Sequence, residues 1–301
     1  LYGEIWRCLS NMVKLPQDQF DLFIASASDV SPKSQQELMA RNWFSLAKQK
    51  RVEPIEHSFG DSWVKVTGNP NHGIATIFDN DVLIFVIAQY MSAINNGMKT
   101  GRRFQFTGYE FFKFVGKKRF GGKGYADLWK SLERLHNTFV ETNIRLRGNT
   151  RHHSFNWLSE IKQNMEDGRH IGYEIVIPEW LYTSVVQDKL VLTLDSGYFE
   201  IKGGLERWLY LFARKTSGWQ TGGWSEGLKS IYSKSGSKSS FSEFKRSVYK
   251  ILHKDSLLGY KVEKIELPRQ TGLHFIRDNE LLKLASKGRK TKGATKWRRE
   301  N

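Results

Sequence analysis

The feature that most constrains the fold is an order of hydrophobic patterns that occurs twice along the chain. In each case three segments with helical spacing of apolar residues are followed by two segments that alternate like strands. The first set has helical patterns from Val82 to Ile94, Phe111 to Val115 and Leu128 to Phe139, then strands at Val140–Arg147 and Phe155–Ile161. In the second set the helical patterns are Leu205–Phe212, Leu228–Tyr232 and Phe244–Leu252, and the strands are Tyr260–Leu267 and Leu273–Arg277.

Local signals mark the ends of several of these helices. Thr107 with Glu110, and Ser240 with Glu243, have the spacing of a capping box, in which each side chain bonds the other residue's backbone. Asp79 or Asn80 is expected to cap the first helix, and Asn96-Gly97 to end it. Additional strands are predicted at Trp63–Thr67, Tyr173–Pro178 and Leu190–Leu194.

Three helices followed by a two-stranded ribbon is the order of a winged-helix domain, and 301 residues are enough for two such domains. The predicted fold is therefore α+β, with two tandem winged-helix (helix-turn-helix) domains. Residues 1–38 would be an N-terminal extension and linker, 39–165 the first domain, 166–280 the second, and 281–301 a basic, disordered tail. A single larger α+β domain is the alternative, because the two halves share no sequence identity that we detect.

The charge of the chain points to a polyanionic partner. Lys and Arg number 47 against 31 for Asp and Glu, a formal charge of +16. DNA, RNA or an acidic membrane surface could supply the anion, and an ordinary basic soluble protein is the alternative. Cys8 is the single cysteine, which excludes an intramolecular disulfide. With no apolar run near 20 residues, the sequence predicts a cytoplasmic protein without membrane spans.

In a winged-helix domain the third helix lies in the major groove and the wing follows the backbone, so the candidate DNA-binding residues are the polar ones on those elements. Glu133 shares the outward face of the first third-helix, where it could accept from a cytosine amino group. A charged face that is merely solvated is the alternative for any one helix. The first domain contributes Lys123, Lys130, Arg134 and Asn137 from its third helix and Arg145, Arg147 and Arg151 from its wing; the second contributes Ser242, Arg246, Tyr249, Lys250 and His253 from its third helix and Lys261, Lys264 and Arg269 from its wing.

Motifs that would indicate enzymatic chemistry do not match. Gly116 to Lys123 departs from a nucleotide-binding P-loop, because Gly122 intrudes and Gly124 follows the lysine. His152 and His153 are adjacent, so on a strand they would point to opposite faces and would not share a metal ion. We therefore expect no catalytic residues, no metal site and no cofactor.

Four segments resemble the replication initiator protein A family, and together they fall within about Asp29 to Leu267. The resemblance implies a plasmid-encoded protein that binds repeated sites in double-stranded origin DNA, helps to open the duplex and has no covalent chemistry of its own. It implies the host replicative helicase and the host initiator as partners, and leaves room for a homodimer. The segments are Asn42–Lys48, His72–Ile84, Gly203–Tyr210 and Lys234–Ser237.

Two other functions remain open from the sequence. A transcriptional repressor on the same fold, including one that represses its own gene, would share every feature described above. A nuclease or nicking enzyme is a third hypothesis, which incubation of supercoiled origin DNA with a divalent metal would test.

Overall fold

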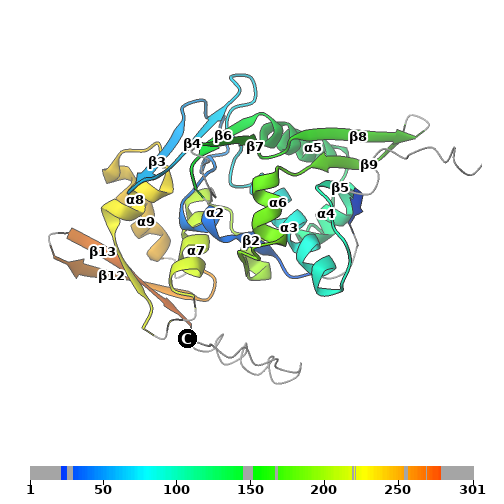
Figure 1. Ribbon diagram of the computed structural model, residues 1–301. Coiled ribbons are helices and arrows are strands. Elements are labelled where there is room, and N and C mark those ends of the chain that lie inside the picture. The colour runs from blue at the N-terminus through cyan, green and yellow to red at the C-terminus, as the bar shows by residue number, and fades with distance from the viewer. Residues whose placement is uncertain are drawn as a thin grey trace, which may run out of the picture.

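The computed structural model describes residues 22–25, 30–144, 152–166, 169–218, 220, 222–253, 257–268 and 270–278. It has a mixed α+β architecture (Figure 1). None of the helices in these ranges is long and apolar enough to cross a membrane. The predicted DNA-binding residues Arg145, Arg147, Arg151 and Arg269 lie outside the described residues, as does the basic tail predicted at 281–301.

One repeat of the helix and strand order, here called the N-terminal unit, lies on the right in Figure 1. Its sheet has the strand order β1-β5-β9-β8, in which the short strand β1 (Leu22–Ile24) runs parallel to β5. The strand β5 pairs antiparallel with β9, and β9 with β8. The unit consists of α3 (Asn80–Asn95), β5 (Arg103–Phe106), α4 (Gly108–Phe114), α5 (Gly122–His136), β8 (Glu160–Glu166) and β9 (Arg169–Val176).

The second repeat, here called the C-terminal unit, lies on the left in Figure 1 and has the same order and pairing. Its sheet order is β11-β13-β12, so the strand after the first helix again pairs antiparallel with the last strand. The three helices predicted in each half are confirmed, as α3, α4 and α5 in the N-terminal unit and as the three helices given below in the C-terminal unit. The unit consists of α7 (Gly204–Thr216), β11 (Trp224–Gly227), α8 (Leu228–Ser235), α9 (Phe241–Leu252), β12 (Tyr260–Leu267) and β13 (Gln270–Arg277).

A separate four-stranded sheet, the bridging sheet, corrects the prediction for the first ribbon. Strands at Val140 and Phe155 do pair, but they belong to a sheet with the order β3-β4-β6-β7, and not to the sheet of the N-terminal unit. The ribbon next to α5 in that unit is the hairpin β8–β9, and the predicted boundary between residues 165 and 166 falls inside it. The bridging sheet consists of β3 (Ile55–Phe59), β4 (Ser62–Gly68), β6 (Thr138–Thr142) and β7 (His153–Asn156).

The remaining elements join the two units. Strand β2 (Lys33–Gln35) precedes the N-terminal unit and pairs with β10 (Val191–Thr193), which follows it. The helix α2 (Gln36–Ala40) packs against α7 of the C-terminal unit. One buried hydrophobic cluster runs through both units, so they share a core. The last two elements are α6 (Glu179–Val186) and the 3-10 helix η2 (Ser196–Glu200).

Both predicted capping boxes are present. The Thr107 hydroxyl accepts from the Glu110 amide, and the Ser240 hydroxyl from the Glu243 amide, while each glutamate accepts from the backbone of its partner. Asp79 occupies the N-cap position of α3, yet its carboxylate makes no bond to the helix amides. It accepts instead from the Thr76 amide at 2.7 Å and the Thr76 hydroxyl at 3.0 Å.

The end of α8 is bound by the N-terminal part of the chain. Carbonyl groups at the end of a helix lack partners within it. Here the Asn42 backbone amide donates to the Lys234 carbonyl and the Asn42 side chain to the Ser235 carbonyl at 2.9 Å, while Arg51 donates to the Gly236 carbonyl. Gly236 itself has a φ of +60°, and a Cβ there would lie 2.8 Å from a methyl group of Ile55. This contact gives a physical reason for glycine in the segment Lys234–Ser237.

We expect Asn42→Ala to lower the free energy of unfolding by about 1–3 kcal/mol, because buried backbone groups would lose their partners. The Asn42 side chain is 1% exposed and also bonds the backbone of Phe44. Urea unfolding of the full chain measures the loss, with the exposed Asn71→Ala as the matched control. Equal stability of the two variants would show that the hydrogen bonds of Asn42 to the end of α8 do not stabilise the fold.

Candidate nucleic-acid interface

A stripe of polar side chains follows the exposed side of α9. Phe244 and Val248 are buried, while Ser242, Arg246, Lys250 and His253 are exposed, as predicted. At a rise of 1.5 Å per residue the stripe is roughly 16 Å long. Among the described residues neither Arg246 nor Lys250 has an ion-pair partner, and Glu243 is held by the capping box at the start of the helix. The stripe therefore presents uncompensated positive charge.

Tyr249 was predicted on this stripe, and that prediction is wrong. Its ring packs against the hydrophobic core, and its hydroxyl is buried without a hydrogen-bond partner in the described part of the chain. At about 100° per residue Tyr249 is next to the apolar side of α9, and a long aromatic side chain at that angle reaches inward.

The two lysines on the β12–β13 hairpin are both exposed, as expected, but they lie on opposite faces of it, since side chains alternate along a strand. Lys261 lies 2.8 Å from Glu263, and Lys264 lies 3.2 Å from Glu266. Each ammonium is thus partly compensated by a carboxylate on the same face. Because the two lysines face opposite ways, they would not make the same contact with one DNA backbone.

On α5 the structure separates the four predicted residues. Lys123 and Lys130 are exposed, and seven residues, or nearly two turns, place them on a similar side of the helix. Asn137 is the C-cap of α5 and its side chain donates to the Glu133 carbonyl at 2.9 Å, so it completes the helix end. Arg134 is the clearest departure from the prediction.

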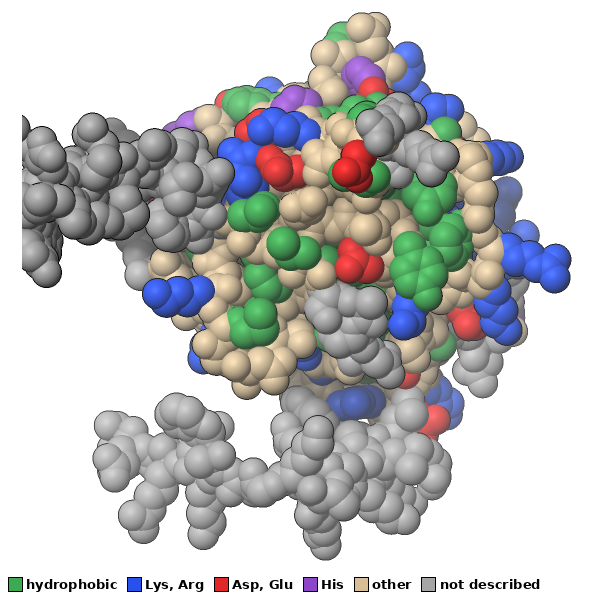
Figure 2. All heavy atoms as spheres, turned by 90° about the vertical axis from the view of Figure 1, so that its right-hand side faces the viewer, with side chains coloured by type: hydrophobic (Ala, Val, Ile, Leu, Met, Phe, Trp, Pro, Cys, Tyr) green, Lys and Arg blue, Asp and Glu red, His purple; other side chains and the backbone are tan. Residues whose placement is uncertain are grey.

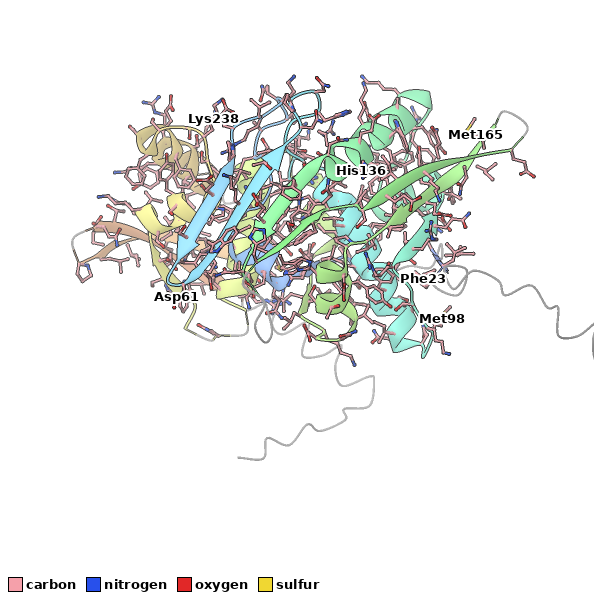
Figure 3. All side chains as sticks on the ribbon, turned by 45° about the horizontal axis from the view of Figure 1, so that its top comes forward. Phe23, Asp61, Met98, His136, Met165 and Lys238 are labelled. Atoms are coloured by element: carbon pink, nitrogen blue, oxygen red, sulfur yellow. The ribbon has the colours of Figure 1, made fainter. Side chains whose placement is uncertain are left out.

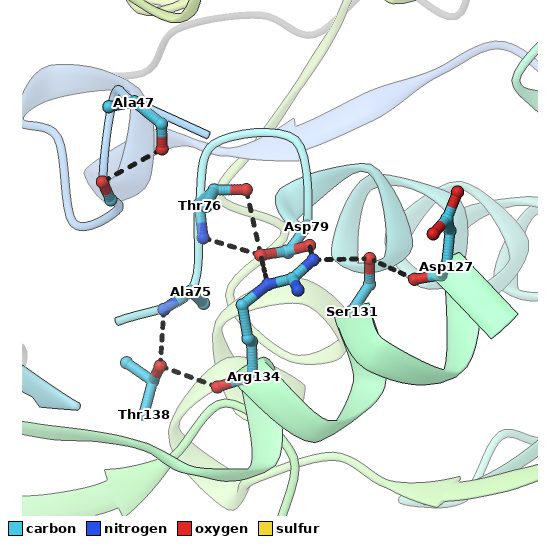
Figure 4. A network of polar contacts seen from close by, with 9 residues as sticks. Ala47, Ala75, Thr76, Asp79, Asp127, Ser131, Arg134 and Thr138 are labelled. Carbon is cyan, nitrogen blue, oxygen red and sulfur yellow. Dashed lines mark hydrogen bonds and ion pairs between the residues drawn. The ribbon is translucent and has the colours of Figure 1, made fainter. Parts of the chain in front are cut away.

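Arg134 is bound by an aspartate from the turn before α3. Its guanidinium donates to the two carboxylate oxygens of Asp79 at 2.8 and 2.6 Å, and to the Ser131 hydroxyl at 3.2 Å (Figure 4). Asp79 is 1% exposed, and its hydrogen bonds raise the pKa of Arg134. The same network continues through Thr138, which accepts from the Ala75 amide and donates to the Arg134 carbonyl. Arg134 therefore fixes α5 to the start of α3 instead of presenting its guanidinium to solvent.

A basic loop between α4 and α5 was not among the predicted DNA-binding elements. Lys117, Lys118 and Arg119 are all exposed, and they lie just before Lys123 at the start of α5. Together they form what we call the α4–α5 basic loop. Its sequence signal is three successive cations, which lie within the Gly116–Lys123 stretch that departs from a nucleotide-binding motif.

His152 and His153 have different surroundings. His152 lies 3.7 Å from the Glu141 carboxylate and beside the Trp63 ring, whereas His153 meets Phe155 edge to face. No group of three His, Cys, Asp or Glu side chains suited to a metal ion occurs among the residues that the structure describes.

Comparisons with known proteins agree with the resemblance. The chain is 33% identical over 211 residues to a protein of Wigglesworthia glossinidia brevipalpis named as a replication protein, covering 68% of this chain and 75% of that one. The fold is similar to crystal structures of domains 2 and 3 of RctB. One of these, from selenomethionine derivatives, has a TM-score of 0.57 and 13% identity, over 80% of this chain and 97% of that one. A second has a TM-score of 0.53 and 13% identity, over 83% and 99%.

The family comparison covers most of the chain. The model of the family described as Replication initiator protein A matches residues 33–262, a range that includes the whole of the N-terminal unit and most of the C-terminal unit. The chain therefore belongs to the replication initiator protein A family.

Proposed function

We propose that the protein is a plasmid replication initiator that binds repeated sites in double-stranded origin DNA through two winged-helix domains. In this proposal α5 and α9 are the third helices, and the hairpins β8–β9 and β12–β13 are the wings. The observation that carries the proposal is the stripe on α9, whose Arg246 and Lys250 lack acidic partners among the described residues. A helix of this width enters the major groove, where base edges are distinguishable.

The two units would contribute differently to recognition. A guanidinium donates two parallel bonds to guanine, and Arg246 on α9 is exposed for this role. On α5 the one arginine is held by Asp79, which leaves the ammonium groups of Lys123 and Lys130 and the α4–α5 basic loop. Flexible ammonium groups serve mainly as phosphate contacts. We infer that the C-terminal unit reads bases and that the N-terminal unit holds the backbone.

Initiation also requires partners. The proposal includes opening of the duplex and recruitment of the host replicative helicase and the host initiator, with no covalent chemistry by this chain. Figure 2 shows hydrophobic side chains at the end of the molecule formed by the N-terminal unit, where β1 is the edge strand of its sheet. Exposed residues on the elements at this end include Ile24 and Tyr109, with exposed fractions of 61% and 54%. Contacts with host proteins or a second copy would use such a surface.

Arg246→Ala is expected to weaken binding to the preferred site by roughly 1–3 kcal/mol and to relax the preference at one base pair. Lys261→Ala is expected to weaken all sequences alike, because its ammonium is a wing charge that Glu263 already compensates in part. The measurement is a binding series on the origin repeat and on each single-base variant of it.

Lys99→Ala is the matched control. It removes an exposed lysine that follows Met98 in the chain. Figure 3 shows Met98 far from Lys238, which lies on the turn before α9, so the control is far from the stripe. If Arg246→Ala weakened every single-base variant equally, α9 would not read bases, and the C-terminal unit would instead hold the DNA backbone.

A further inference from the structure

A cavity of about 460 Å³ lies where the two units meet. Its walls come from the turn before α3, from α4 and α5 of the N-terminal unit, and from η2 and α7 next to them. The volume is in the range of roughly 300–1,000 Å³ that small-molecule sites occupy. The proposed DNA contacts on α9 do not involve this cavity.

Two ion pairs neutralise much of the charge in the cavity wall. Arg134 is paired with Asp79, and the Arg207 guanidinium lies 2.7 Å from the Asp81 carboxylate. Arg207 also donates to the carbonyls of Ile201 and Phe199, which leaves it with little capacity for a ligand. These pairs hold the walls in place.

Three lysines from three different segments remain around the cavity. Lys48, Lys117 and Lys130 line it and have no ion-pair partner in the described part of the chain, and Asp127 is the one other carboxylate in the lining. The Lys48 ammonium lies 4.8 Å from the centre of the Phe78 ring, and that of Lys117 lies 5.2 Å from the Phe112 ring. Contact with a ring face attracts a cation and restricts its position.

Part of the cavity wall is apolar, and the wall also includes a carboxyl group, that of Asp81, with a shifted pKa. Phe111 and Phe112 are 7% and 1% exposed, so the site has a low local dielectric that strengthens charge interactions. Burial raises the pKa of Asp81 to about 6, although Arg207 and Lys117 act in the opposite direction. A cavity lined by several lysines and a perturbed carboxyl group is typical of a binding site.

We propose that this cavity binds a small phosphorylated molecule, whose phosphate oxygens accept hydrogen bonds from Lys48, Lys117 and Lys130. Three lysines from separate segments that line one cavity match a multiply charged anion better than a single carboxylate, which one of them would satisfy. The proposal goes beyond origin binding. Lys117 and Lys130 also belong to the surface that would hold the DNA backbone, so a bound phosphate ligand competes with the duplex for the same charges.

The test uses inorganic pyrophosphate as the probe and the full chain, with titration calorimetry at constant ionic strength. We expect one saturable site per chain, and a loss of affinity of about tenfold or more in both Lys48→Gln and Lys117→Gln, because each removes a charged hydrogen bond. Lys99→Gln, at an exposed lysine outside the cavity lining, should bind as the unchanged chain does. Melting temperatures without ligand show that the variants are folded.

A duplex titration separates the two sources of phosphate. If pyrophosphate does not bind, or binds weakly at many sites that the variants do not affect, the proposal is overturned, and a loss of duplex affinity in Lys117→Gln would then assign these lysines to the DNA backbone. If pyrophosphate binds at one site and excess pyrophosphate lowers duplex affinity, the shared use of Lys117 and Lys130 is supported. Saturable pyrophosphate binding by a chain that binds no duplex would overturn the proposed function alone.

Discussion

Arg207→Leu is expected to lower the free energy of unfolding by about 3–5 kcal/mol, because it breaks a buried ion pair and leaves one charge uncompensated. The Arg207 side chain is 5% exposed and that of Asp81 14%. The guanidinium also donates to Ile201 at 2.8 Å and to Phe199 at 3.0 Å, and it lies over the rings of Phe78 and Tyr198. Urea unfolding of the full chain measures the loss, with the exposed Lys202→Leu as the control.

The size of this loss should depend on pH in a defined direction. The pKa of Asp81 is raised from 3.8 to about 6 in the folded chain, so its contribution to stability is fully present below pH 3.8 and is lost as the pH rises through 6. Without Arg207 the folded pKa rises further, since the opposing charge is gone. The difference between variant and unchanged chain should therefore be smallest near pH 5 and largest near pH 8.

A second variant separates the charge from the packing. In Arg207→Leu combined with Asp81→Leu no buried charge is left alone, so most of the lost stability should return. A loss that is equal at every pH and is not restored by the second substitution would show that packing around Arg207, and not the Asp81 charge, sets its importance.

The helices could be predicted from the sequence because their signals are local. The apolar spacing of α3 and α9, and the capping boxes at Thr107 and Ser240, involve residues within a few positions of one another. The sequence also shows the glycines of the family-like segments, but it does not show why glycine is needed at those positions. A Cβ at Gly204 would overlap the Leu46 carbonyl oxygen, a contact between segments far apart in the sequence.

The strand pairing could not be predicted, because it depends on distant partners. The segment around Val140 alternates as a strand should, yet nothing in it indicates that it pairs with β4 as well as with β7. The hairpin β8–β9 was largely missed for a different reason. Glu160–Glu166 has only two apolar residues, Ile161 and Met165, and no residue that is fully buried, so it lacks the alternation that marks a half-buried strand.

In the candidate site, too, the features that depend on local spacing could be predicted and those that depend on distant residues could not. Helical spacing placed Ser242, Arg246, Lys250 and His253 on the exposed side of α9, where they are found. It could not show that Arg134 is bound by Asp79, 55 residues earlier in the chain. A helical wheel predicts the direction of a side chain but not the charge that meets it there.

The affinity for duplex DNA is expected to fall on the order of 10³–10⁵-fold between 50 and 200 mM salt, which corresponds to about 6–10 phosphate contacts. The structure presents exposed cations for contacts of that number on the surfaces assigned to DNA. Each contact releases a condensed counterion, so the slope of log affinity against log salt reports their number. These cations are Lys117, Lys118, Arg119, Lys123, Lys130 and Lys250.

Fluorescence anisotropy on the origin repeat, at a series of salt concentrations, measures this slope. Replacing both Lys117 and Lys118 with Gln should make it shallower by about two units, since each removed phosphate contact changes it by close to one. The same substitutions should affect the repeat and an unrelated duplex equally, because phosphates carry no sequence information. A nearly flat salt dependence would mean that the exposed cations of the α4–α5 basic loop do not meet phosphates, and the formal charge of +16 would then serve another polyanion.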